Sequence, residues 1–130
     1  MEDSQFYIYW NKSNLPYTVK LDGNWEVCAV SISASESHSS AVTPLLLCTN
    51  LCEDSIVGSR TLPILRELSS VDAAYREFNP LQYHRVRQSS FNSIKIELLN
   101  NQGQLLPTII ESCTLHFRRS GSLCDQGWSG

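Results

Sequence analysis

The closing third of the chain, residues 82–119, constrains the fold most, because it consists of strand patterns joined by short polar turns. Over residues 113–118 apolar and polar side chains alternate, which is the period of a strand with one buried face. Its apolar members are Cys113, Leu115 and Phe117. Earlier, residues 101–103 (Asn-Gln-Gly) separate two apolar runs, 91–99 and 104–110, and predict a hairpin turn. This segment therefore predicts consecutive antiparallel strands.

The rest of the chain repeats this pattern and adds few other elements. Residues 25–32 are apolar on both strand faces, as expected of a strand in the middle of a sheet that is covered twice. Residues 31–40 contain six serines and predict a flexible loop. Residues 62–68 fit either a short helix opened by proline or an edge strand. Residues 72–78 predict one or two helical turns, with Asp72 as a cap.

About eight short strands can be counted, and the connections between them are too short for alternating strand–helix–strand crossovers. The predicted fold class is all-β, a sandwich or barrel of antiparallel strands. At 130 residues the chain is long enough for one domain. We expect that domain to cover residues 1–119, with residues 120–130 as a flexible tail.

The charge of the chain excludes some classes of protein. The formal net charge of −3 argues against a nucleic-acid binder that works by neutralising phosphates. Only 18% of the residues are charged, which fits either a surface that is buried against partners or simply a strand-rich domain. The first residues lack the basic and apolar character of a secretion signal, and no apolar run reaches membrane-spanning length. We expect the five cysteines to stay reduced, in cytoplasm or nucleus.

A zinc site is the first chemical possibility that the sequence raises. The candidate ligands are Cys48, Cys52, Cys113 and His116. Cys113 and His116 lie three apart on a predicted strand, so their side chains should point to opposite faces. Cys48 and Cys52 should share a face, as two buried core cysteines also would. We therefore expect no metal site.

The sequence also lacks a motif for enzymatic catalysis. The three histidines, His38, His84 and His116, are scattered, and the last two are expected to be ordinary outward strand residues. No nucleophile motif or phosphate-binding glycine loop is present. We therefore expect neither catalysis nor a cofactor. A sugar-binding sandwich remains an alternative, because exposed aromatics could stack on a sugar. The candidate aromatics are Tyr7, Tyr9 and Trp128.

Three sequence blocks, taken in order, resemble one protein family. They are FYIYWNKSN with LDGNWEVCAVSIS, then LCTNLCEDSIVGSRTLPILREL, and finally the strands of residues 83–118. Together they resemble the penton-type, single jelly-roll capsid proteins of Polinton/Maverick elements and adintovirus-like DNA viruses. The matching positions are Leu21, Gly23, Trp25, Glu26, Val27, Val57, Gly58, Pro63, Leu65, Arg66, Tyr83, Val86, Phe91, Ile94, Ile96, Leu98, Gly103, Leu115, His116, Phe117 and Arg118. A shortened middle and the Gly58-Ser59-Arg60 sequence mark a divergent or shortened member.

The resemblance implies a jelly-roll β-sandwich of two four-stranded sheets. It also implies a homopentamer at the five-fold vertices of an icosahedral shell, beside a double jelly-roll major capsid protein. The virion, and the host cytoplasm or nucleus during assembly, would be its locations. The implied family-motif core is Trp25, Val27, Ile94, Ile96, Leu115 and Phe117. The candidate assembly contacts are Arg66, Tyr83 and Arg118, where the arginines form either subunit salt bridges or exposed rim charges.

The alternative to this reading is an intracellular β-sandwich that binds a protein or a ligand and has no capsid role. In this alternative the module is domesticated from a viral element.

Overall fold

A computed structural model describes residues 4–35, 38–39, 44–71, 74–107 and 110–120. Within these ranges all regular structure is β-strand, which confirms the predicted all-β class. The strands are β1 (Gln5–Trp10), β2 (Asn14–Lys20), β3 (Trp25–Ala34), β4 (His38–Ser39), β5 (Leu45–Thr49), β6 (Ser55–Val57), β7 (Arg60–Leu62), β8 (Ile64–Leu68), β9 (Ser70–Val71), β10 (Tyr75–Glu77), β11 (His84–Arg85), β12 (Ser90–Ser93), β13 (Ile96–Leu99) and β14 (Ile110–Arg119).

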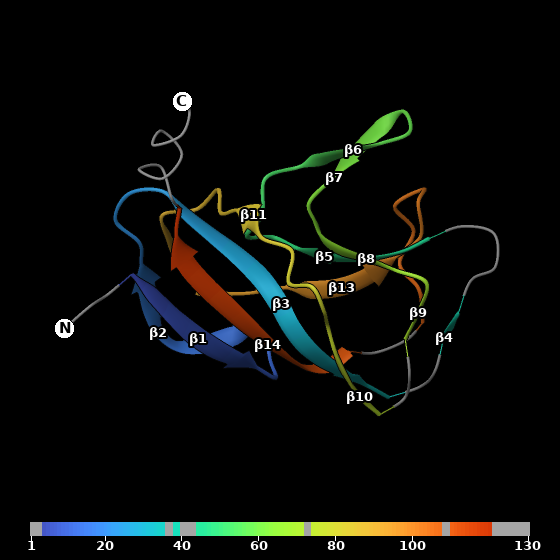
Figure 1. The fold of residues 1–130 in the computed structure, drawn as a ribbon, viewed down its shortest axis with the longest axis horizontal. Coiled ribbons are helices and arrows are strands. Elements are labelled where there is room, and N and C mark those ends of the chain that lie inside the picture. The colour runs from blue at the N-terminus through green and yellow to red at the C-terminus, as the bar shows by residue number, and fades with distance from the viewer. Residues whose placement is uncertain (1–3, 36–37, 40–43, 72–73, 108–109, 121–130) are drawn as a thin grey trace.

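The first layer of the fold is a continuous antiparallel sheet in the order β1-β14-β3 (Figure 1). Both β10 and β11 pair with the remaining edge of β3, one near each end. The two longest strands, β3 and β14, run side by side from the pair Trp25–Arg119 to the pair Ala34–Ile110. Their register shifts between Thr114 and Leu115, which is a β-bulge.

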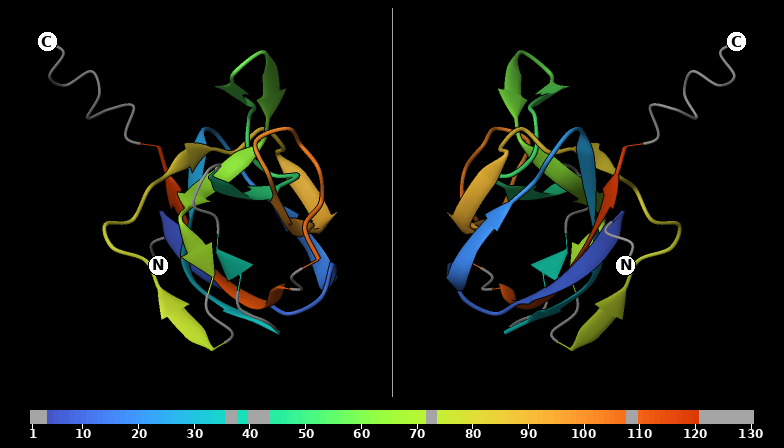
Figure 2. Two further views of the ribbon diagram at one scale, coloured as in Figure 1. Left: turned by 90° about the vertical axis from the view of Figure 1, so that its right-hand side faces the viewer. Right: turned by 90° about the vertical axis from the view of Figure 1, so that its left-hand side faces the viewer.

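The second layer is made of shorter pieces. One piece is the pair β2 and β12, and the other is the sheet β13-β5-β8. Because β12 leads directly into β13, the order of strands across this layer is β2, then β12 with β13, then β5, then β8. If β10 with β11, and β12 with β13, are each counted as one strand position, each layer has four positions of antiparallel strands, the jelly-roll arrangement. Figure 2 shows the strands of both layers surrounding a common centre.

One hydrophobic core fills the space between the layers. It combines inward side chains of the first layer, such as Val27 and Phe117, with those of the second, such as Leu47 and Leu98. The six family-motif positions are all buried and all belong to this cluster: Trp25, Val27, Ile94, Ile96, Leu115 and Phe117. The alternation read in residues 113–118 thus places Cys113, Leu115 and Phe117 inside.

Several local predictions hold in the structure. Gly103 has a positive φ angle of 82° in the turn predicted at residues 101–103, and the hairpin turn between β6 and β7 contains Gly58 with a φ of 63°. Residues 64–68 form an edge strand, which settles the earlier ambiguity in favour of strand. The strand of residues 25–32 occupies the centre of the first layer, with neighbours on both edges.

Other local predictions were wrong. Residues 75–77 form strand β10 rather than a helical turn, because their backbone groups pair with β3; the proposed cap Asp72 lies outside the described residues. The predicted serine loop begins later, since β3 continues to Ala34, and the small side chain of Ser31 is buried. Residues 91–99 are two strands, broken where the Ile94 N–H donates to the Ser13 carbonyl at 2.8 Å.

The predicted domain of residues 1–119 with a tail of residues 120–130 stays a prediction. One main core contains side chains from Trp10 to Phe117. Ser120 still donates its N–H to the Asn24 carbonyl at 2.7 Å. The remainder of the predicted tail lies outside the described residues.

Candidate functional site

The candidate site is the solvent side of the first layer, called here the outer face. Strand alternation places one set of side chains toward the core and the next set on this face. The outer face carries Gln5, Tyr7 and Tyr9 from β1, His116 and Arg118 from β14, and Glu26 and Cys28 from β3.

His116 lies at the centre of this face and joins two segments. The Tyr83 hydroxyl lies 2.7 Å from His116 Nδ1, and Gln5 Oε1 lies 2.8 Å from Nε2. The Gln5 oxygen only accepts, so Nε2 carries the hydrogen and Nδ1 accepts from Tyr83. Burial, and then the charge of Arg118, lower the pKa of His116 and keep the ring neutral. His116 was expected to be an ordinary outward residue; it is on the outer face but only 7% exposed.

The segment of residues 78–83, here called the strap, connects β10 to β11 beside the edge of β3. The Phe78 N–H donates to the Val30 carbonyl of β3 at 2.9 Å. Arg66 Nη1 donates to the Pro80 carbonyl at 2.7 Å, and its guanidinium stacks over the Phe78 ring at 4.7 Å. These contacts hold the beginning of the strap against the sheet.

The end of the strap is held by β14. The Arg118 guanidinium lies 3.5 Å from the centre of the Tyr83 ring, a close cation–π contact. Arg118 Nε also bonds Glu26 Oε1 at 2.9 Å. The three candidate assembly contacts, Arg66, Tyr83 and Arg118, therefore converge on the strap and are engaged within the subunit. Sequence reasoning selected these residues but not their shared contact.

A buried thiol lies beneath the strap. Cys28 is inaccessible to solvent, and burial raises the pKa of its thiol despite the hydrogen bonds and nearby cations that lower it. Burial, followed by the contact with Cys28, raises the pKa of Tyr83 to about 12. At neutral pH the cluster therefore holds a thiol, a phenol and a neutral imidazole. None of these is an activated nucleophile, so the arrangement is suited to holding the strap.

The burial of His84 also differs from the prediction. His84 was predicted to point outward, yet it is half-buried on β11, and its Nε2 has no hydrogen-bond partner in the structure. Burial lowers the pKa of this imidazole.

The proposed zinc ligands lie on different sides of the sheets. Cys52 belongs to the main core, whereas Cys48 packs with Leu46 and Leu99 in a separate small cluster. The two cysteines therefore do not share a face, contrary to expectation, because β5 ends at Thr49, between them. Cys113 points inward and His116 outward. Within the described ranges no three metal-ligating side chains come together.

Burial also determines the thiol pKa of the other three cysteines in the described part of the chain. It raises the pKa of Cys48, Cys52 and Cys113 to about 12. Protonated thiols of this kind act as small apolar side chains.

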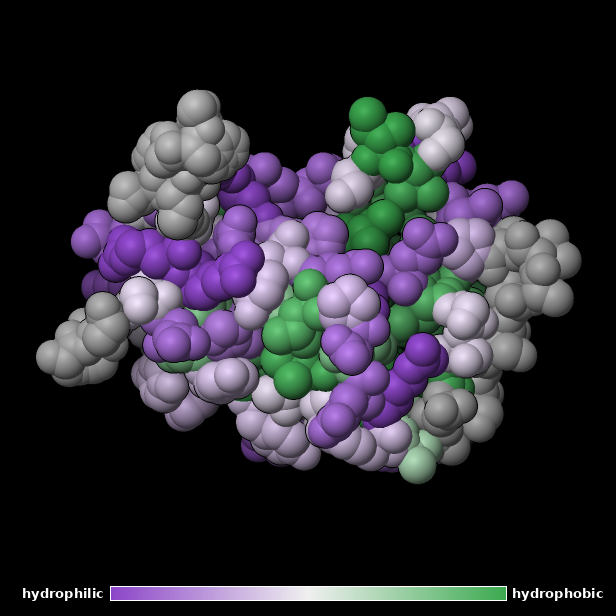
Figure 3. Space-filling model, viewed as in Figure 1, coloured by the Kyte–Doolittle hydropathy of each residue, from purple (hydrophilic) through white to green (hydrophobic). Residues whose placement is uncertain are grey.

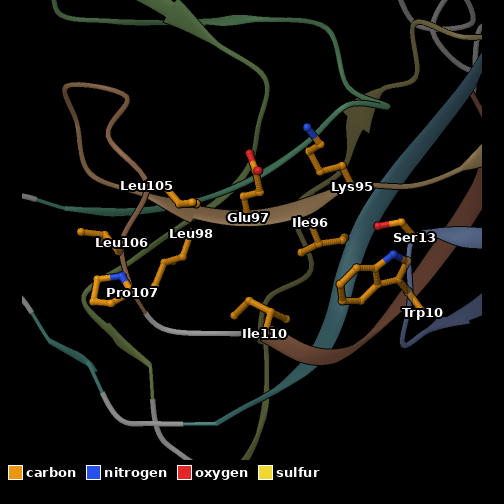
Figure 4. Close-up of a pocket in the computed structure, with 10 residues that line it drawn as sticks. All are labelled: Trp10, Ser13, Lys95, Ile96, Glu97, Leu98, Leu105, Leu106, Pro107 and Ile110. Carbon is orange, nitrogen blue, oxygen red and sulfur yellow. The ribbon is translucent and has the colours of Figure 1, made fainter.

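A pocket of about 490 Å³ opens where the second layer is interrupted (Figure 4). The side chains of Trp10, Ile96, Leu98 and Ile110 lie around a common space, while Lys95 and Glu97 point to the other side of β13. Trp10 is fixed by its indole N–H, which donates to the Ile94 carbonyl at 2.7 Å. This pocket was not predicted from the sequence, because it depends on the break between β12 and β13.

The hairpin of β6 and β7 projects from the second layer, as both views of Figure 2 show. Val57 and Leu62 of this hairpin pack against the small cluster around Cys48. Ile56 is 82% exposed, and Figure 3 shows apolar surface on this projection. Tyr7 and Tyr9 of the outer face are also exposed, at 64% and 66%. Trp128, the third candidate aromatic, lies outside the described residues.

Within the described part of the chain, no helix has the length and apolar character needed to cross a membrane. Comparison of the chain with protein-family models, curated protein sequences and solved structures finds no match.

Proposed function

We propose that the chain is a penton-like structural protein that forms homopentamers at the five-fold vertices of an icosahedral shell. Its partners are copies of itself and a double jelly-roll major capsid protein, and its place is the virion, with assembly in the host cytoplasm or nucleus. The proposal includes no catalytic residue, cofactor, membrane contact or specific nucleic-acid contact. It is supported by the ordered sequence blocks that resemble penton proteins and by the jelly-roll arrangement.

The observation that carries the proposal is the projecting hairpin of β6 and β7. A ring requires a heterologous interface, in which one surface of each subunit meets a different surface of the next. Ile56 presents a nearly bare apolar side chain on a hairpin that stands away from both layers. Contiguous exposed apolar surface marks sites of contact with partners, and Figure 3 shows apolar surface on this hairpin. We infer that this hairpin is one of the two surfaces of the ring contact.

The test measures oligomeric mass by light scattering after size-exclusion chromatography, at several protein concentrations. We expect a pentamer, alone or in the presence of a double jelly-roll capsid protein, and loss of the pentamer in Ile56→Lys. Thr18→Lys is the matched control, because Thr18 is also exposed but lies on β2, away from this hairpin. A strict monomer that no such capsid protein recruits would refute the proposal.

A second candidate function is a β-sandwich module that binds a small apolar ligand. The apolar pocket between β13 and β14 favours it, since ligand sites are concave and mainly apolar. Native mass spectrometry of the purified protein would show a bound molecule. Leu98→Trp, which fills the pocket, should remove that molecule; a ligand retained in this variant would argue against the pocket.

A further inference from the structure

The free edge of the first layer is strand β1. It pairs with β14 on one side, and none of the described strands pairs with its other side. The Arg119 N–H donates to the Ser4 carbonyl at 2.8 Å. Because backbone groups alternate in direction along a strand, even-numbered residues of β1 turn theirs toward β14. The N–H and C=O groups of Gln5, Tyr7 and Tyr9 therefore face the free edge.

This edge lacks the usual protection against pairing. Proteins blunt edge strands with charges, prolines or bulges. Three other edges carry such residues: β2 has Pro16 and Lys20, β8 has Arg66 and Glu67, and β10 has Arg76 and Glu77. By contrast, β1 reads QFYIYW, with no charge and no proline, and its register with β14 is regular.

The sequence of β1 is also symmetric about Ile8. Residues 6–10 read Phe-Tyr-Ile-Tyr-Trp, so the order of aromatic and aliphatic side chains is the same from either end. We propose that β1 pairs antiparallel with β1 of a second copy of this chain, with Ile8 at the two-fold axis. This pairing joins the first layers of two subunits into one continuous sheet.

The proposed register satisfies both the backbone and the side chains. Tyr7 lies opposite Tyr9 of the partner subunit, and these are the residues whose backbone groups face the free edge, so each pair exchanges two hydrogen bonds. Their rings lie together on the outer face, where cross-strand aromatic pairs stabilise a sheet. On the inner face Ile8 meets its own copy, and Phe6 meets Trp10 of the partner subunit. Phe6 and Ile8 are only partly buried in the monomer, so the pairing covers them further.

This contact does not depend on the proposed pentamer. An isologous contact uses the same surface on both subunits and is complete with two copies, whereas a ring uses two different surfaces. Both the strap and the hairpin of β6 and β7 stay outside it. The two assemblies can therefore be tested separately.

The first test uses hydrogen exchange of the wild-type chain over a dilution series. In the dimer the amides of Tyr7 and Tyr9 become protected as concentration rises, together with an increase of mass to two chains in light scattering. Tyr9→Lys places one positive charge in each of the two paired strands. The two lysines repel each other across the contact and should weaken the dimer ~10-fold or more. Tyr75→Lys, an exposed tyrosine on β10, is the matched control and should leave it unchanged. Concentration-independent exchange at both amides would overturn the proposal.

A cross-link tests the register. Ile8 and Ile8 of the partner subunit form a non-hydrogen-bonded pair, with Cα atoms about 4.5 Å apart, which is within the range of a disulfide. Ile8→Cys in a Cys124→Ser background should form a covalent dimer on mild oxidation. Thr18→Cys, exposed on β2, should not. Equal cross-linking of both variants would overturn the proposed register. If Ile56→Lys loses the pentamer while the Ile8→Cys cross-link still forms, that result bears on the proposed pentamer and not on the pairing of β1.

Discussion

The two layers of the sandwich are built differently. In the first layer β3 and β14 pair along almost their whole ten-residue length. In the second layer the strands are shorter, and the segment opposite β2 and β5 is broken between β12 and β13. The continuous layer supports the ordered contacts of the outer face, from Gln5 through His116 to Tyr83. The interrupted layer produces the pocket and the projecting hairpin. A rigid sheet and a more divided one thus carry different kinds of surface.

The largest expected effect contrasts core residues of the two layers. Phe117 is fully buried between Phe6 and Phe91, whose rings lie 4.8 and 5.9 Å from its own. Phe117→Ala should lower the free energy of unfolding by about 4 kcal/mol. Ile96→Ala, beside the pocket of the second layer, should cost about 2 kcal/mol, because existing space reduces the contacts that are lost. Urea titration followed by circular dichroism measures both; equal losses would contradict the contrast.

The second-largest expected effect concerns the hydrogen bond from Trp10 that stabilises the break in the second layer. Trp10→Phe leaves the buried Ile94 carbonyl without its donor and should cost about 2 kcal/mol. Trp25→Phe is the control, since the indole of Trp25 bonds the nearby Asp22 carbonyl at a partly buried site. We expect it to cost about 1 kcal/mol or less. A larger loss of unfolding free energy for Trp25→Phe than for Trp10→Phe would mean that the hydrogen bond to Asp22 stabilises the fold more than the hydrogen bond at the break does.

The outer face should also make stability depend on pH. Burial and Arg118 lower the pKa of His116 in the folded protein, and burial lowers the pKa of His84. An unfolded histidine binds a proton near pH 6.5, so below about that pH the unfolded state takes up protons first and folding stability falls. We expect Tm to decrease as the pH drops from about 7 toward the lower folded pKa values.

The substitution His116→Gln separates the two histidines. It should reduce the slope of Tm against pH, while His84 supplies the remainder. Calorimetry at closely spaced pH values measures the slopes; an unchanged slope would show that His116 protonates without disturbing the strap. Because burial is the larger cause of the shift and Arg118 the second, Arg118→Ala should change the slope less than His116→Gln does.

The smallest effect compares one exposed ion pair from each layer. Arg118→Ala removes the bond to Glu26 and the stacking on Tyr83, and should cost below about 1 kcal/mol, because the side chain is half exposed. Arg87→Ala removes a longer pair, 3.6 Å to Asp54, and should cost close to zero. Double-mutant cycles with Glu26→Ala and Asp54→Ala measure the coupling in each case.

Local pattern predicted the parts of the fold that depend on local chemistry. The alternation in residues 113–118 predicted a strand, and the Asn-Gln-Gly sequence of residues 101–103 predicted a turn, which contains Gly103 with its positive φ. The all-β class followed from the number of predicted strands. The helical turn expected at residues 72–78 failed because pairing with β3 overrode local propensity.

The candidate site was less predictable. Arg66, Tyr83 and Arg118 come from three distant segments, and only the folded chain shows that they hold one strap. The burial of His116 depends on Tyr83 and Gln5, which lie 33 and 111 residues away in sequence. The uncharged β1, in contrast, was readable as a strand, but its position at a sheet edge required the topology.

The turn of the β6 and β7 hairpin has one more consequence. A side chain added at Gly58 would meet no atom within 4 Å, and the hairpin rests on a cluster separate from the main core. Peptide inserted between Gly58 and Ser59 would therefore extend into solvent and leave both layers unchanged. This site is suited to displaying an epitope or a fluorescent label, which would let single molecules be followed by light microscopy.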